Sequence, residues 1–266
     1  MQLNLLCVSI LIYTLAIDAY INYQSKNSKN RKNINHFILY SKKHQAEKYN
    51  DKMNNLYKPI TLNQKNYVKY LNNQNVDLVL GIGPAGTGKT LFACDAAIRE
   101  LKNGNIQKII ITRPLVPVEE ELGFLPGSIN NKMDPWTRPI FDIFQEYYSM
   151  PEVNLMVKNG IIEISPLAFM RGRTFKNAFI IADEMQNSSP NQMLMLVTRI
   201  GDNSRMVITG DLKQSDRTEK NGLKDFLFKY KNTNYLDKIK LIEFNNLDIQ
   251  RSEIVSIIIK MYESNY

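Results

Sequence analysis

Cysteine and histidine are scarce in this chain of 266 residues, which has two of each. The cysteines are Cys7 and Cys94, and the histidines, His36 and His44, lie close together in a polar stretch. Two cysteines are too few for a disulfide framework or a structural zinc site, and their scarcity agrees with a reducing compartment. We therefore exclude metal centres built from clusters of histidine and cysteine.

The N-terminus lacks an apolar run of the length that usually crosses a membrane. Residues 5–17 form an uncharged, mostly apolar run of 13 residues, which Asp18 ends, whereas a spanning helix needs about 20. A cleavable signal peptide would have basic side chains before its apolar run, and none precedes this one. We expect a cytoplasmic protein. Membrane contact through residues 3–23 is the less favoured alternative, and the basic residues at 26–32 would then keep the rest of the chain on the cytosolic side.

Acidic residues are few in the first 58 positions. Nine lysines and arginines face three carboxylates there, so this segment carries +6 of the formal net charge of +8. It is rich in Asn and Lys and has no apolar periodicity, which predicts a disordered or weakly helical extension. Such a tail could touch polyanions, or have no partner at all. We place the domain boundary near residue 58, with one globular domain over 59–266.

The rest of the chain alternates short apolar runs with amphipathic segments. Hydrophobic residues make up 44% of the 30.8 kDa chain, enough for one large core but not for two motor domains. Alternating strands and helices indicate an α/β fold with a mainly parallel sheet and ligands at the carboxyl ends of the strands. The expected strands are 77–82, 108–112, 161–165, 178–183, 205–211 and 238–244. The expected helices are 61–71, 88–104, 134–149, 190–200, 221–231 and 251–262.

A phosphate-binding loop follows the first expected strand. Residues 83–90 fit the pattern GxxxxGK[ST] and open an expected helix, the context that this motif requires. In such a loop the backbone N–H groups face phosphate oxygens, Lys89 would bridge the β- and γ-phosphates, and Thr90 would offer its hydroxyl to Mg²⁺. The predicted ATP-binding residues of the loop are Gly83, Pro84, Ala85, Gly86, Thr87, Gly88, Lys89 and Thr90.

Two further strand ends carry polar residues suited to nucleotide hydrolysis. Asp183 and Glu184 follow an apolar run, so the first could face the metal and the second the attacking water. Gln214, in the segment GDLKQ, can donate to a γ-phosphate and accept from water. The alternatives are a solvated acidic strand end for the first pair and an ordinary polar turn for the second segment.

Taken together, these segments resemble the PhoH family of P-loop ATPases, which look like the nucleotide-binding half of superfamily 1 helicases. The similarity covers about residues 61–262. The matching segments are GIGPAGTGKT (81–90), ITRP (111–114), LGFLPG (122–127), MDPWTRPIFD (133–142), SPLAFMRGRTF (165–175), IIADEMQN (180–187), TGDLKQSD (209–216) and NLDIQRSEIV (246–255).

The resemblance implies a three-layer RecA-like P-loop fold and further site residues. Gln64 would bind the adenine edge, although its place three residues after Thr61 also fits a capping box at a helix start. Arg251 would contact the γ-phosphate. Ser252 replaces a frequent histidine of the family and Met185 an alanine; neither departure removes a donor or a metal ligand.

Other residues have two interpretations each. The arginines at 113, 171 and 173 could contact nucleotide, nucleic acid or a neighbouring subunit, with ordinary salt bridges as the favoured alternative. Trp136 and Phe141 could stack on bases, although packing within the protein is the favoured interpretation.

One nucleotide domain leaves the γ-phosphate open on one side, whereas helicases close it with a second domain. We therefore expect a homo-oligomeric ring in which a neighbour's arginine completes the site, as the resemblance also implies. The first functional hypothesis is an ATPase using ATP and Mg²⁺ to remodel RNA or another single-stranded nucleic acid. The alternative is a nucleotide-state switch in phosphate or stress physiology that acts on a protein partner.

Overall fold

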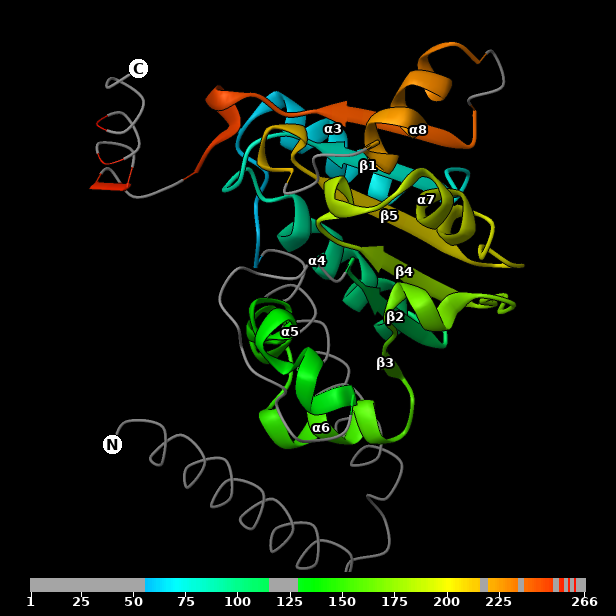
Figure 1. Cartoon of the computed structure of the whole chain (residues 1–266). Coiled ribbons are helices and arrows are strands. Elements are labelled where there is room, and N and C mark those ends of the chain that lie inside the picture. Colours follow the sequence, from blue (N-terminus) through cyan, green and yellow to red (C-terminus); the bar gives the residue numbers. More distant parts are fainter. Residues whose placement is uncertain are drawn as a thin grey trace, which may run out of the picture. The chain divides into compact units, whose positions relative to one another are not determined.

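The computed structural model describes residues 56–114, 129–215, 220–233 and 237–250, together with 254, 255, 258 and 261; side chains of 129–136 are not described (Figure 1). Contacts group Tyr57–Tyr266 into one compact unit. Its helices are α3 (Leu62–Leu71), α4 (Lys89–Lys102), α5 (Ile129–Gln145), α6 (Met150–Lys158), α7 (Pro190–Val197) and α8 (Gly222–Lys231). Its strands are β1 (Leu78–Ile82), β2 (Lys108–Thr112), β3 (Ile162–Ile164), β4 (Ala178–Ala182), β5 (Arg205–Gly210) and β6 (Ile239–Glu243). Short 3-10 helices are η1 (Leu167–Met170), η2 (Met185–Asn187), η3 (Leu212–Gln214) and η4 (Asn246–Asp248).

These strands form one sheet in which every pairing is parallel, in the order β3-β2-β4-β5-β1-β6. β1 lies between β5 and β6, and Leu80 is in register with Ile208 and Leu241. β1, β4 and β5 are buried along their whole length, as expected for strands covered on both faces. The carboxyl ends of these strands therefore share one edge of the sheet.

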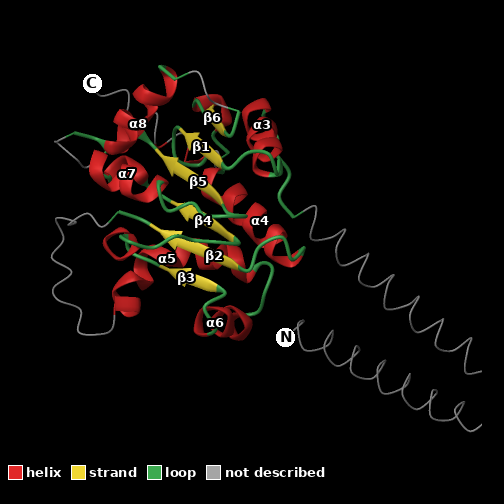
Figure 2. Ribbon diagram, turned by 90° about the vertical axis from the view of Figure 1, so that its right-hand side faces the viewer, coloured by secondary structure: helices red, strands yellow, loops and turns green. Residues whose placement is uncertain are grey.

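Helices cover both faces of the sheet. α3 and α4 lie on one side, and α7 and α8 on the other (Figure 2). α5 and α6 pack on each other, with α5 also against α4 and α6 against β3. The α/β fold with a parallel sheet that the sequence predicts is confirmed, with each strand within about one residue of its expected bounds.

The helix predictions differ from the structure in three places. α7 ends at Val197, three residues before its expected end. α5 begins at Ile129, five residues before its expected start, and ends at Gln145. α6 was not predicted, although Ser149 and Glu152 form a capping box at its start. That signal was missed because the helix has only nine residues and buries only Val153. The expected helix 251–262 and the extension 1–58 lie almost wholly outside the described residues, and no helix within the described part is long and apolar enough to span a membrane.

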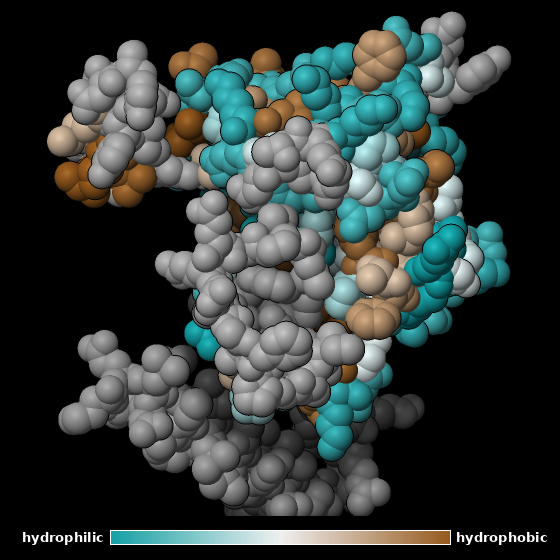
Figure 3. Space-filling view, viewed as in Figure 1, coloured by the Kyte–Doolittle hydropathy of each residue, from teal (hydrophilic) through white to brown (hydrophobic). Residues whose placement is uncertain are grey.

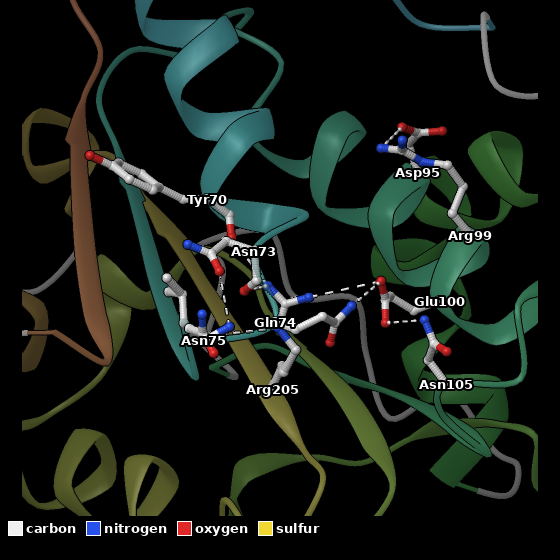
Figure 4. A network of polar contacts seen from close by, with 10 residues as sticks. Tyr70, Asn73, Gln74, Asn75, Asp95, Arg99, Glu100, Asn105 and Arg205 are labelled. Carbon is white, nitrogen blue, oxygen red and sulfur yellow. Dashed lines mark hydrogen bonds and ion pairs between the residues drawn. The ribbon is translucent and has the colours of Figure 1, made fainter.

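Arg205, the first residue of β5, connects the sheet to two helices at the amino ends of the strands. Its guanidinium donates to the carbonyls of Val76, Tyr70 and Asn73, at 3.0, 3.1 and 3.0 Å (Figure 4). These three residues lie at the end of α3 and in the segment that leads into β1. The guanidinium also lies 4.0 Å from Glu100 near the end of α4. Because a guanidinium presents donors in a fixed fork, one side chain sets the position of three elements.

Candidate nucleotide site

The loop between β1 and α4 is held from two sides by backbone contacts. The N–H of Gly83 donates to the carbonyl of Gly210 at the end of β5, at 3.0 Å. Gly83 has φ +144°, and a methyl group in its place would lie 2.5 Å from the carbonyl oxygen of Phe244. Only glycine fits there, because both the backbone conformation and the close approach of the chain after β6 exclude a side chain.

Lys89 opens α4 and turns its ammonium group back into the loop. The Nζ atom lies 2.6 Å from the carbonyl oxygen of Gly83 and 2.7 Å from that of Pro84. The backbone carbonyl of Lys89 accepts from the hydroxyl of Tyr67 on α3, at 3.2 Å. Burial, and then the charge of Asp183, raises the pKa of Tyr67, so the phenol stays a neutral donor that supports the first turn of α4.

Asp183 lies at the end of β4 and accepts two hydroxyl hydrogen bonds on the same oxygen. Thr90 donates to Oδ1 at 2.8 Å, and Thr209 of β5 donates to the same atom. The structure thus brings Thr90 and Asp183 together, as their prediction as metal ligands requires. Hydroxyl and carboxylate oxygens are the ligands that Mg²⁺ prefers.

Glu184 turns away from its neighbour because its backbone is left-handed, with φ 54° and ψ 39°. This conformation is uncommon for a residue with a side chain and occurs often at functional sites. Asp183 faces the hydroxyls, while Glu184 lines a pocket of about 250 Å³ beside the loop. The remaining lining residues are Ala85, Gly86, Gly88, Lys89, Thr90, Leu91, Thr209, Gly210, Asp211 and Gln214.

Gln186, which the sequence analysis did not single out, joins the two strand ends of the site. Its side chain is 1% exposed. Nε2 donates to the carboxylate of Glu184 at 2.5 Å and to the carbonyl of Gln214 at 3.4 Å, and Oε1 accepts from the N–H of Asp211 at 3.1 Å. The backbone carbonyl of Gln186 accepts from Ser215 at 3.2 Å. The signal that could have found it is a neutral amide two residues after the acidic pair.

Gln64 has protein partners for its whole amide group. Oε1 accepts from the N–H groups of Ile60 and Thr61, at 2.8 and 3.2 Å, and the capping box of α3 is complete. Nε2 donates to the carbonyls of Thr87 and Asp248, at 3.2 and 3.4 Å. The side chain is 2% exposed. Contact with adenine stays a prediction, and it would require the exchange of some of these bonds.

The segment after β6 is hydrogen-bonded to the phosphate-binding loop and to α3. The N–H of Gln250 donates to the carbonyl of Gly86 at 2.9 Å, and Asn63 donates to the carboxylate of Asp248 at 2.8 Å. Arg251 itself lies outside the described residues, but the residue before it is bonded to the loop.

The remaining candidates are dispersed. Arg173 forms an ion pair with Glu163, the alternative that the sequence analysis favoured. Arg113 is partly exposed just after β2, and Arg171 is exposed after η1. Phe141 is partly buried on α5, whereas the side chain of Trp136 lies outside the described residues.

A parallel α/β sheet, a GxxxxGK[ST] loop between β1 and α4, and acidic residues at the end of β4, which β5 separates from β1, define a P-loop protein with a RecA-like fold. The family model of the PhoH-like proteins matches residues 57–263, and the chain belongs to that family.

Curated relatives from bacteria match this region. The PhoH-like protein of Bacillus subtilis (strain 168) is 45% identical over 204 residues, which cover 76% of this chain and 63% of that protein. Protein PhoH of Escherichia coli (strain K12) is 36% identical over 201 residues, 72% of this chain and 54% of that protein. The matched region thus spans less than two thirds of these relatives.

Among solved structures, the Pif1 helicase from Candida albicans matches 77% of this chain and 43% of its own, at 16% identity and a TM-score of 0.39.

Proposed function

We propose that the chain is a Mg²⁺-dependent ATPase that hydrolyses ATP to remodel RNA or another single-stranded nucleic acid. The observation that carries the hydrolysis is the position of Glu184 in the same pocket as Lys89 and Gln214, turned away from Asp183. Asp183 is bonded to Thr90, whereas the carboxylate of Glu184 is not, so Glu184 is available to orient and polarise a water molecule.

Within this proposal each residue has one task. Backbone N–H groups of the loop and Lys89 bind the β- and γ-phosphates, and Thr90 with Asp183 would hold Mg²⁺. The ion would neutralise developing phosphate charge. Glu184 accepts a proton from the attacking water, and Gln214 contacts the γ-phosphate.

The proposed ring rests on the open side of the pocket. Within the described residues the nucleotide pocket is bordered by one domain only, and Arg251 follows directly on Gln250 at the loop. We propose that subunits assemble head to tail, so that an arginine of a neighbour completes the site. A monomer with full turnover in sedimentation and rate measurements would rule this out.

The test is phosphate release from ATP by the full chain, with and without single-stranded RNA, beside Glu184→Gln. We expect Mg²⁺-dependent turnover that rises with RNA in a salt-sensitive way and is lost in the variant. Turnover that is lost in the variant but indifferent to RNA would favour a nucleotide-state switch acting on a protein partner. Phosphate transferred to a metabolite instead of water would overturn the ATPase proposal.

A further inference from the structure

A tight turn follows η1 and presents one arginine to solvent. The N–H of Arg173 donates to the carbonyl of Met170 at 3.1 Å. Arg171 has φ −62° and ψ 130°, and Gly172 has φ 79°, which together describe a type II turn. Because a positive φ is needed at its third position, glycine there fixes the direction in which Arg171 leaves the chain.

The far side of this turn is anchored by Arg173. Its guanidinium forms two hydrogen bonds with the carboxylate of Glu163 and lies 4.6 Å above the ring of Phe175. Its backbone carbonyl accepts from the guanidinium of Arg199, at 2.9 Å. The turn is therefore held by side chains on both sides and does not depend on Arg171.

Arg171 itself has no hydrogen bond or ion pair among the described residues, and it is exposed. Two positions before it, Phe169 is 56% exposed. Within the part of the chain that the structure describes, Arg199 donates only to the neutral oxygens of Met195, Arg173 and Thr198. An exposed aromatic residue thus precedes by two positions an exposed arginine that has no partner among the described residues, and Arg199 is bonded to the backbone of the same turn.

The surface around this turn is apolar as well as basic. Apolar atoms gather over α7 and the chain beside it (Figure 3), and α7 packs against η1. Phe169, Arg171 and Arg199 do not line the nucleotide pocket. η1 follows β3, the edge strand that β2, β4 and β5 separate from β1.

We propose that the surface formed by Phe169, Arg171 and Arg199, the 169–199 surface, binds single-stranded nucleic acid. One base stacks on Phe169, and Arg171 binds the adjacent phosphate, with Arg199 adding positive charge. Stacking on an exposed ring accepts any base, and an arginine fork matches phosphate oxygens. This inference rests on the proposed nucleic-acid function and assigns that function a surface.

The test is fluorescence anisotropy of a labelled oligouridine with the full chain, in a series of salt concentrations. We expect Phe169→Ala to weaken binding about tenfold or more, and Phe169→Trp to retain it. Arg171→Ala should weaken binding and lower the slope of log affinity against log salt by about 0.7, the value for one phosphate of a single strand, whereas Arg171→Lys keeps that slope. The control is Phe228→Ala, since Phe228 on α8 is 70% exposed and outside this surface.

ATP hydrolysis without RNA, measured in the same proteins, separates this inference from the proposed function. We expect it to be unchanged in every variant. If Phe169→Ala and Arg171→Ala bind oligouridine as well as the wild type does, the assignment of the 169–199 surface is wrong, while the nucleic-acid function stands. An equal loss in Phe228→Ala also overturns the surface. If the wild type hydrolyses ATP but binds no oligouridine, the result contradicts both the nucleic-acid function and the assignment of this surface.

Discussion

The side-chain amide of Gln186 donates a hydrogen bond to the carboxylate of Glu184, two residues earlier in the chain. The same amide accepts from Asp211 and donates to the carbonyl of Gln214. One buried side chain therefore spans the gap between the end of β4 and the loop after β5. A shift of that loop would therefore reach the carboxylate of Glu184 through the amide of Gln186.

Replacing Gln186 with alanine should reduce turnover more than nucleotide binding. Gln186 is a positioning residue, so its loss frees Glu184 and leaves the contacts of the phosphate-binding loop intact. We expect kcat to fall by roughly 10²-fold, the effect of misplacing a reacting group by about 1 Å. Binding of a fluorescent ATP analogue should change only a few-fold.

The matched control is Gln192→Ala, because Gln192 caps α7 with its side chain. It should lower thermal stability without changing kcat. Equal losses of kcat in the two variants would show that Gln186 acts through stability alone.

Gln64→Ala tests the two interpretations of that residue in one protein. The variant loses the capping box and the bonds to Thr87 and Asp248, so we expect stability to drop by about 1–3 kcal/mol in urea unfolding. If Gln64 also contacts adenine, the variant should prefer ATP over GTP less than the wild type does, as the affinities of both proteins for the two nucleotides would show. An unchanged preference would leave Gln64 as a capping residue.

Arg205→Met should destabilise the domain without a direct effect on the nucleotide site. Arg205 is 6% exposed, and its removal takes one donor from each of three carbonyls and a positive charge from beside the buried carboxylate of Glu100. We expect a loss of about 3 kcal/mol in urea unfolding. Lys176→Met, which removes an exposed ion pair with Asp202, should change the midpoint little. Similar shifts for both variants would contradict the role of burial.

Stability should fall as the pH rises above the ordinary pKa of a cysteine thiol, about 8.5. Burial, followed by the charges of Asp183 and Asp95, raises the pKa of Cys94 in the fold. The native state keeps the proton while the unfolded chain releases it, so the stabilisation is complete below this pH and is lost above it. Urea unfolding between pH 7 and 10 should show a shallower decline in Cys94→Ala. Parallel curves would exclude Cys94 as the cause.

The sequence predicts the loop and the acidic pair because both depend on local order. The GxxxxGK[ST] pattern and the apolar run before Asp183 each place a polar group at a strand end. The hydrogen bonds of Gln186 are not predictable in this way, because they form only when β4 and β5, separated by η2 and α7, become neighbours. The left-handed backbone of Glu184 is equally hidden, since the residue types around it do not demand it. The capping box of α3, by contrast, can be predicted from the spacing of Thr61 and Gln64, and it is confirmed.

The strand order also bears on how the protein is made. β1 carries the phosphate-binding loop but pairs with β5 and β6, which are synthesised more than a hundred residues later. While the ribosome is still adding residues up to about 250, β1 has unpaired edges and the loop lacks its contacts with Gly210, Phe244 and Gln250. Nascent chains halted before β6 should therefore be prone to aggregation and unable to retain ATP, and the capacity to bind it should arise in one late step of translation.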